Sequence, residues 1–183
     1  SYYFYFNFFR KKKNLNKKFL PRTFGRKRGR NRNFSVDQFN YLQKKYRLLN
    51  YDLGKNPIIE IGSGNGENTI KLSKINPKNN IIACEVYKDG NFSLMKKIHK
   101  QNIKNVNVFN DNFLLLLKNI PKNSIEEYWL LFPDPWPKKR HNKRRIISSE
   151  FLERLCFTLK KSGRIFIATD NSNYFLSIMM KIL

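Results

Sequence analysis

The chain has 183 residues, which is enough for one domain and leaves little room for a second. Its 37 lysines and arginines outnumber 13 aspartates and glutamates, and the formal net charge of +24 favours a polyanionic partner. Hydrophobic residues make up 40% of the chain, which excludes wholesale disorder. No apolar run approaches the ~20 residues of a membrane span. Two cysteines and two histidines cannot build a disulfide framework or the usual zinc sites, so we expect no metal and a reducing compartment.

The N-terminal segment is strongly basic. No acid occurs in the first 36 residues, and 12 of the 23 residues from Arg10 to Arg32 are Lys or Arg. Because this stretch has no sustained hydrophobic period, we expect residues 1–34 to form a flexible basic arm and residues 35–183 to form the folded domain. A targeting peptide is the alternative, since transit sequences are also basic and poor in acids. An organelle is therefore the alternative to a cytoplasmic location.

The rest of the chain is predicted to alternate between strands and helices. Ser35 opens a capping box with Gln38, and apolar residues follow at helical spacing. Short apolar runs predict five strands, at Ile58–Ile61, Ile81–Val86, Val106–Phe109, Tyr128–Phe132 and Ile165–Ala168. The segments after them predict helices at about Glu67–Ile75, Asn91–Gln101, Phe113–Asn119, Ser149–Lys161 and Ser172–Ile182. We expect Ser149 to be an N-cap and Gly163 to lie just beyond a helix end. Strands that are each followed by a helix predict an α/β fold, with a doubly wound parallel sheet covered on both faces.

The scarce acids follow the predicted strands. Five of the thirteen lie in, at the end of, or just after a strand: Glu60, Glu85, Asp111, Asp134 and Asp170. In an open parallel sheet, ligands bind over the carboxyl ends of the strands, near the point where strand order reverses. The sequence therefore predicts a group of carboxylates at one edge of a basic protein.

The first predicted strand runs into a glycine-rich loop with Gly62, Gly64 and Gly66. Glycines at alternate positions let the backbone turn sharply and approach a ligand, although a turn that serves packing alone is the alternative. The spacing differs from the dinucleotide fingerprint and resembles the first motif of the class I S-adenosylmethionine-dependent methyltransferases. Glu85 then suits the two hydroxyls of a ribose, and Asp111 with Asn112 would face the adenine. Carboxylates also suit a cationic sulfonium cofactor better than they suit NAD.

The most distinctive segment runs from Phe132 to Ile146. Pro133 and Pro135 enclose Asp134, so the loop is stiff and holds this acid at the edge of the sheet. Six of the eight residues from Lys138 to Arg145 are cationic, enough to bind phosphates beside the loop. A solvated helix face or a localisation signal is the alternative for such a run.

These motifs together resemble the tRNA (guanine-N7-)-methyltransferase family in its single-subunit bacterial form. The most specific match is Pro133-Asp134-Pro135-Trp136 followed by Lys138, Arg140, His141 and Lys143-Arg144-Arg145-Ile146. Supporting matches are Glu60 to Gly64, Glu85, Asn110-Asp111, Ala168-Thr169-Asp170 and the basic segment from Arg22 to Arg30. The family continues beyond this point with final strands and a Thr-x-Phe-Glu segment, so we expect C-terminal strands of the family to be missing from this chain.

The resemblance implies a Rossmann-like fold of the class I type, S-adenosylmethionine as cofactor, S-adenosylhomocysteine as product, and tRNA as partner. It implies no metal and no obligate protein partner. The cofactor-binding residues would be Glu60, Gly62, Gly64, Gly66, Glu85, Asp111 and Asn112. Asp134 would be the catalytic acid, and the residues that bind tRNA would be Lys138, Asp170, Arg26 and Arg28.

The implied reaction is methylation of a guanine in the tRNA variable loop, usually at position 46. Guanine N7 already carries a lone pair, so we expect a direct in-line displacement without a general base, in which positioning supplies most of the rate enhancement. Two alternatives remain open at this point: a methyltransferase that acts on another RNA base, and a tRNA-binding module without catalysis.

Overall fold

The computed structural model describes residues 2–6 and 35–182. Its strands are β1 (Tyr2–Phe6), β2 (Ile58–Ile61), β3 (Ile81–Cys84), β4 (Val106–Phe109), β5 (Ile125–Leu131) and β6 (Leu159–Thr169). Its α-helices are α1 (Val36–Tyr46), α2 (Glu67–Ile75), α3 (Lys88–Lys100), α4 (Phe113–Leu117), α5 (Ser149–Thr158) and α6 (Ser172–Ile182). A 3₁₀ helix, η1 (Lys139–Arg144), follows β5.

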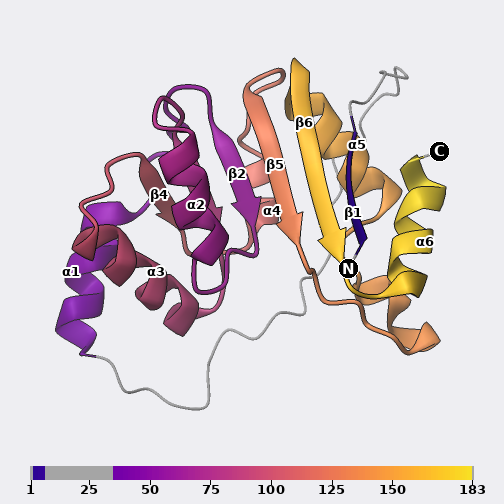
Figure 1. Cartoon of the computed structure of the whole chain (residues 1–183), viewed down its shortest axis with the longest axis horizontal. Coiled ribbons are helices and arrows are strands. Elements are labelled where there is room, and N and C mark those ends of the chain that lie inside the picture. Colours follow the sequence, from indigo (N-terminus) through magenta and orange to yellow (C-terminus); the bar gives the residue numbers. More distant parts are fainter. Residues whose placement is uncertain (1, 7–34, 183) are drawn as a thin grey trace.

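One six-stranded sheet runs through the molecule in the order β1-β6-β5-β2-β3-β4 (Figure 1). The five strands from β2 to β6 are parallel, as the alternation of apolar runs and helices predicts. From β2 the chain first builds outward through β3 and β4, and then returns to add β5 and β6 on the other side. The strand order therefore reverses between β2 and β5, which is where an open sheet of this kind binds its ligand.

The outermost strand corrects one expectation. Residues 2–6 fall inside the range predicted as a flexible arm, but they form β1, which pairs antiparallel with β6 from Tyr2 opposite Thr169 to Phe6 opposite Ile165. It adds an antiparallel edge strand to the five parallel strands. The ring of Tyr2 also stacks on Phe175 of α6, with 4.6 Å between ring centres. The rest of the predicted arm, residues 7–34, lies outside the described part of the chain.

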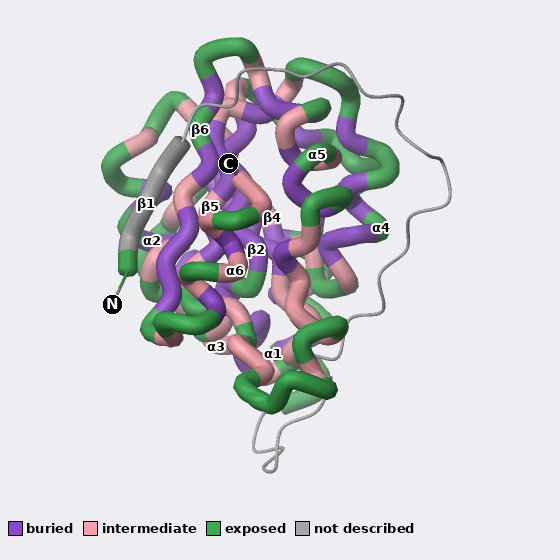
Figure 2. The backbone as a smooth tube through the Cα atoms, turned by 90° about the vertical axis from the view of Figure 1, so that its right-hand side faces the viewer, coloured by how far each residue is buried: buried purple, intermediate pink, exposed green. Residues whose placement is uncertain are grey.

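Helices cover both faces of the sheet and create two apolar layers. One layer joins α4, α5 and α6 to the strands, and the other joins α1, α2 and α3 to them. Buried stretches follow the strands, whereas exposed residues gather on the outer loops (Figure 2). Strands β2 and β3 are buried on both faces, and Glu60 is the acidic exception among their isoleucines. None of the helices within residues 35–182 is long and apolar enough to cross a bilayer.

Several boundaries differ from the predicted ones for identifiable reasons. Ser148, not Ser149, caps α5, because its hydroxyl accepts a 3.2 Å hydrogen bond from the Phe151 N–H. Strand β5 begins at Ile125 rather than at Tyr128, because Glu126 and Glu127 interrupt the apolar run from which its start is predicted. Gly163 lies within β6 rather than beyond a helix end, and a Cβ atom there would come within 2.8 Å of the Glu126 carbonyl. Close approach of β5 and β6 therefore requires this glycine.

Candidate functional site

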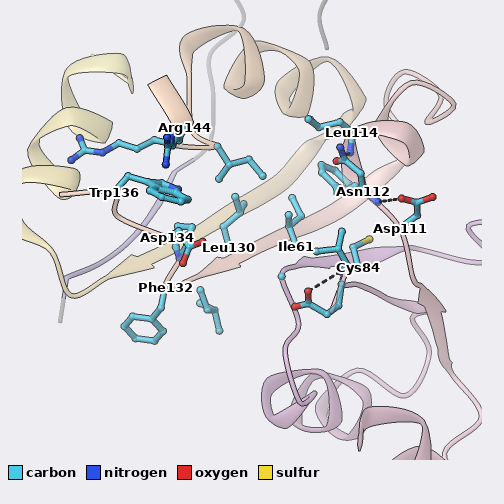
Figure 3. A pocket seen from close by; sticks show the side chains of 18 of the residues that line it. Ile61, Cys84, Asp111, Asn112, Leu114, Leu130, Phe132, Asp134, Trp136 and Arg144 are labelled. Carbon is cyan, nitrogen blue, oxygen red and sulfur yellow. Dashed lines mark hydrogen bonds between the residues drawn. The ribbon is translucent and has the colours of Figure 1, made fainter. Parts of the chain in front are cut away.

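A pocket of about 290 Å³ opens over the carboxyl ends of β2, β3 and β5, across the point where strand order reverses. Asp134, Phe132 and Trp136 lie on one side of it and Asp111 and Asn112 on the other (Figure 3). The apolar surface between them comes from Ile61, Cys84 and Leu130. Of the predicted site residues, the pocket brings together Gly62, Glu85, Asp111, Asn112 and Asp134.

The glycine loop after β2 depends on left-handed backbone. The φ angles of Gly62, Gly64 and Gly66 are 80°, 52° and 79°, a region that other residues adopt at a cost. A Cβ atom at Gly62 or Gly64 would meet nothing within 4 Å, so open space adjoins the loop there. At Gly66 it would collide with Leu94 of α3, so the third glycine also serves packing. The loop thus leaves room for a ligand at its first two glycines only.

The Glu85 carboxylate binds the glycine loop directly. One oxygen accepts a 2.9 Å hydrogen bond from the Gly64 N–H. The other accepts from the N–H groups of Val86 and Tyr87 at 2.7 and 2.9 Å. A carboxylate offers about four acceptor positions. With three of them in use, Glu85 has room for about one further donor, whereas the predicted ribose contact needs two.

Glu60 lies beneath the loop rather than in the pocket. It is 3% exposed, and its carboxylate accepts hydrogen bonds from Asn68, at 3.2 Å, and from the Thr69 hydroxyl, both on α2. The pKa of Glu60 is raised to about 7. Burial is the largest cause; the hydrogen bonds from Thr69 and Asn68 lower the pKa, and the charge of Glu85 raises it. This acid therefore connects β2 to the first turn of α2.

Asp111 and Asn112 form the turn after β4. The Asp111 carboxylate accepts a 2.6 Å hydrogen bond from the Asn112 N–H. The side-chain oxygen of Asn112 accepts from the Leu114 N–H at 2.9 Å and caps α4. Both side chains line the pocket, so this cap places polar groups at the end of the pocket away from Asp134.

The loop that carries Asp134 has an unusual backbone. Phe132 and Trp136, which flank the Pro-Asp-Pro segment, have φ angles of 51° and 42°. Left-handed backbone at non-glycine residues of this size is uncommon and is found at functional sites. The Phe132 N–H donates a 2.8 Å hydrogen bond to the Ala168 carbonyl of β6, which anchors the start of the loop. Asp134 itself is exposed at the mouth of the pocket.

The cations from Lys138 to Arg145 divide into two groups. Four are exposed: Lys138, Lys139, Arg140 and Lys143. Two are half-buried against the loop. The guanidinium of Arg144 lies 4.9 Å from the centre of the Trp136 ring, and Arg145 Nε donates a 2.7 Å hydrogen bond to the Pro135 carbonyl. Nothing in the spacing of the run distinguishes the two groups, so the sequence does not reveal this second role.

His141 lies within this positive field. Loss of solvent, together with the charges of Arg144, Lys138 and Lys143, lowers the pKa of His141 below its ordinary value. Its ring meets Trp136 edge-on, with 5.8 Å between ring centres. The surrounding positive charges therefore favour the neutral form of the histidine.

The remaining predicted residues lie around the pocket or outside the described chain. Lys138 is exposed at the start of η1, and Asp170 is exposed directly after β6. Neither residue lines the pocket. Arg26 and Arg28 fall within residues 7–34, which the structure does not describe. Among residues 2–6 and 35–182, no group of three or more His, Cys, Asp or Glu side chains could hold a metal ion.

Comparison with known proteins places this arrangement in a family. The family described as "Putative methyltransferase" matches residues 55–183. A tRNA (guanine-N(7)-)-methyltransferase of Mycoplasmopsis synoviae is 36% identical over 149 residues, which cover 80% of this chain and 71% of that protein. The chain belongs to the tRNA (guanine-N7-)-methyltransferase family. A member from Wolbachia pipientis is 46% identical over 116 residues, which are 63% of this chain and 52% of the relative. The chain spans about half the length of this and several other curated relatives.

Solved structures agree on the fold. A precorrin-6y C5,15-methyltransferase of Geobacter metallireducens has a TM-score of 0.56 at 15% identity, over 78% of this chain and 67% of that one. An antibiotic-related methyltransferase has a TM-score of 0.52 at 20% identity, over 84% of this chain and 75% of the other. At such low identity the likeness concerns the fold alone, which is the class I methyltransferase fold that the glycine loop predicts.

Proposed function

We propose that this member of the tRNA (guanine-N7-)-methyltransferase family transfers a methyl group from S-adenosylmethionine to N7 of a guanine in the tRNA variable loop. One observation carries the proposal: Asp134 lines the same pocket as Gly62 and Glu85. A cofactor beside the glycine loop and a base held by Asp134 would therefore meet inside one cavity.

The residues present suit this cofactor. The open space beside Gly62 and Gly64 lets a ligand approach the backbone closely. Asp111 and Asn112 supply polar groups, and Ile61 supplies an apolar surface for a flat ring. The cations that line the pocket are Lys143, Arg144 and Arg145, which lie at the end of η1 and just after it. The other end of the pocket, near Glu85 and Asp111, is therefore acidic. An acidic end suits a positively charged sulfonium compound.

The capacity of Glu85 refines the expected cofactor contact. Because three backbone N–H groups already use its carboxylate, we expect Glu85 to accept one ribose hydroxyl and not two. Its larger contribution would be to fix the glycine loop against β3. Glu60 would act one layer further out, by holding the start of α2 below the same loop.

When bound, the cofactor would supply an electrophilic methyl group. Guanine N7 would donate its lone pair to the methyl carbon, while the carbon–sulfur bond breaks and its electron pair returns to sulfur. No proton leaves N7, so the chain need not provide a base. The Asp134 carboxylate would accept hydrogen bonds from the N1–H and amino group of guanine. It would thereby orient N7 and stabilise the positive charge that the purine gains. Adenine offers an acceptor at N1 and would be rejected.

Binding of tRNA would use the exposed cations beside the pocket. Lys138 stands at the start of η1, with Lys139, Arg140 and Lys143 following it on the same exposed segment. Such side chains neutralise phosphates and release counterions, so affinity should fall steeply with salt. Asp170, at the end of the neighbouring strand, is the proposed polar contact to tRNA, and Arg26 and Arg28 remain predictions outside the described residues.

The proposal is tested with two tRNA transcripts that differ at one atom. One carries guanine at the methylated position of the variable loop, and the other carries 7-deazaguanine, in which carbon replaces N7. We expect methyl transfer from S-adenosylmethionine to the first and none to the second, with equal binding of both. Equal transfer to both transcripts, or binding of the first without transfer, would contradict the proposal.

A further inference from the structure

Arg145 belongs to the basic run, but its side chain turns toward the loop that carries Asp134. Its Nε donates a 2.7 Å hydrogen bond to the Pro135 carbonyl, and its guanidinium carbon lies 4.7 Å from the centre of the Tyr174 ring. Arg145 is half-buried, and Tyr174 is wholly buried near the start of α6. One side chain therefore joins the Asp134 loop to α6.

The loop requires support from outside. Left-handed φ angles at Phe132 and Trp136 are unfavourable for residues with large side chains, and such backbone persists only where the surroundings hold it. Pro133 and Pro135 have no N–H groups, so the loop cannot use these residues as hydrogen-bond donors. The Pro135 carbonyl is next to Asp134, so a bond at this carbonyl restrains the acid through a single residue.

The ring behind Arg145 is itself fixed. The Ile147 N–H donates a 3.3 Å hydrogen bond to the Tyr174 hydroxyl, and the Tyr174 N–H donates at 2.8 Å to the side chain of Asn171. Asn171 follows Asp170 directly, in the turn between β6 and α6. Arg145 and Tyr174 thus connect the loop after β5 to the turn after β6.

We propose that Arg145 is a positioning residue for methyl transfer, and that it acts through Pro135 and Tyr174 and not through a tRNA phosphate. The inference rests on the proposed function. The cations of the basic run then have different roles, because Arg145 fixes the place of Asp134 in the pocket, whereas exposed cations such as Lys139 and Arg140 bind tRNA.

Arginine is needed at this position for its shape. A planar guanidinium can lie against an aromatic ring and donate from Nε in its own plane, whereas a lysine keeps the charge but lacks both features. Arg145→Lys therefore separates positioning from charge. Arg145→Met removes the charge as well, and Arg140→Met removes an exposed charge from the same run as a matched control.

The experiment uses the full 183-residue chain and measures kcat, KM for tRNA, and tRNA affinity over a range of salt concentrations. We expect both Arg145 variants to lose about 10- to 100-fold in kcat, since a small misplacement of a reacting group costs about this much. Their KM and salt slope should match those of the unmodified chain. Arg140→Met should instead raise KM and reduce the salt slope by up to about 0.9, the value for one phosphate contact.

Two results would overturn the inference. The first is an unchanged kcat in Arg145→Lys. This variant keeps the charge and the aliphatic stem, so it provides the test even if Arg145→Met fails to fold. The second is a reduced salt slope in Arg145→Met that equals the reduction in Arg140→Met, because Arg145 would then contact a phosphate. If the unmodified chain transfers no methyl group, the proposed function falls and this inference with it. An active unmodified chain with an active Arg145→Lys overturns the inference alone.

Discussion

The Glu85 carboxylate accepts a 2.9 Å hydrogen bond from the backbone N–H of Gly64, 21 residues earlier in the chain. This bond joins the ends of β2 and β3 at the point where the pocket opens. An acid expected to bind the cofactor therefore also shapes the loop that receives it. Loss of the Glu85 carboxylate should then affect both the fold and the ligand.

Glu85→Gln tests this double role. The amide keeps the shape of the side chain, but its NH2 group must face at least one of the backbone N–H groups that now donate to the carboxylate. We expect the free energy of unfolding to fall by about 1–3 kcal/mol, the cost of a donor left without a partner. Affinity for S-adenosylhomocysteine should fall as well. Denaturant unfolding and calorimetry measure the two effects, and wild-type values for both would refute the assignment.

The first and third glycines of the loop should respond differently to the same change. Gly62→Ala has space for its Cβ atom, so it should lose about 1–2 kcal/mol of stability for its left-handed φ and weaken cofactor binding by filling the open space. Gly66→Ala adds a collision with Leu94 and should lose more stability. Chemical denaturation of the two variants compares them. Equal losses would show that the packing of Gly66 against α3 is unimportant.

Glu60 should make stability depend on pH. Its pKa is about 7 in the folded chain against 4.5 ordinarily, so the protonated form is favoured by folding. The stability that this group contributes is fully present below about pH 4.5 and is lost as pH rises through 7. Across both pKa values the loss is about 3 kcal/mol, since each of the roughly 2.5 pKa units between them is worth about 1.36 kcal/mol. Glu60→Gln should remove this slope, and parallel pH curves for the two proteins would contradict the prediction.

Asp134→Asn should separate chemistry from cofactor binding. The amide cannot accept from both donors on the guanine edge and carries no charge to stabilise the methylated purine. We expect single-turnover methylation to slow by about 10²–10³-fold, as when one electrostatic contact to a transition state is removed. Cofactor affinity should be retained, because Asp134 lies on the other side of the pocket from Asp111 and Asn112. An unchanged rate would exclude the proposed role.

Local patterns in the sequence predict most of the parallel sheet. The bounds of β2, β4, α2 and α6 agree with the apolar runs and helical periods that predict them. The start of α1 also agrees, since Ser35 caps this helix and its hydroxyl accepts a 3.3 Å hydrogen bond from the Gln38 N–H. These elements are determined by residues close together in the chain, which is why their signals are readable without a structure.

What the sequence does not reveal depends on partners far away in the chain. The start of β5 contains Glu126 and Glu127, which interrupt the apolar pattern but form ion pairs with Lys160 and Arg164 of β6. Similarly, Arg145 looks like another phosphate contact until the fold brings Tyr174 against it. Strand β1 lacks the alternation of a half-buried strand, and its place at the edge of the sheet depends on pairing with β6 and on the stacking of Tyr2 against Phe175 of α6.

Methyl transfer to guanine N7 is best tested by identifying the nucleoside that receives the methyl group. tRNA is incubated with the chain and isotopically labelled S-adenosylmethionine, then digested to nucleosides and to oligonucleotides for mass spectrometry. We predict label in 7-methylguanosine alone, located in the variable loop. Label in any other nucleoside, or none in a tRNA that the chain binds, would show that the proposed reaction is wrong.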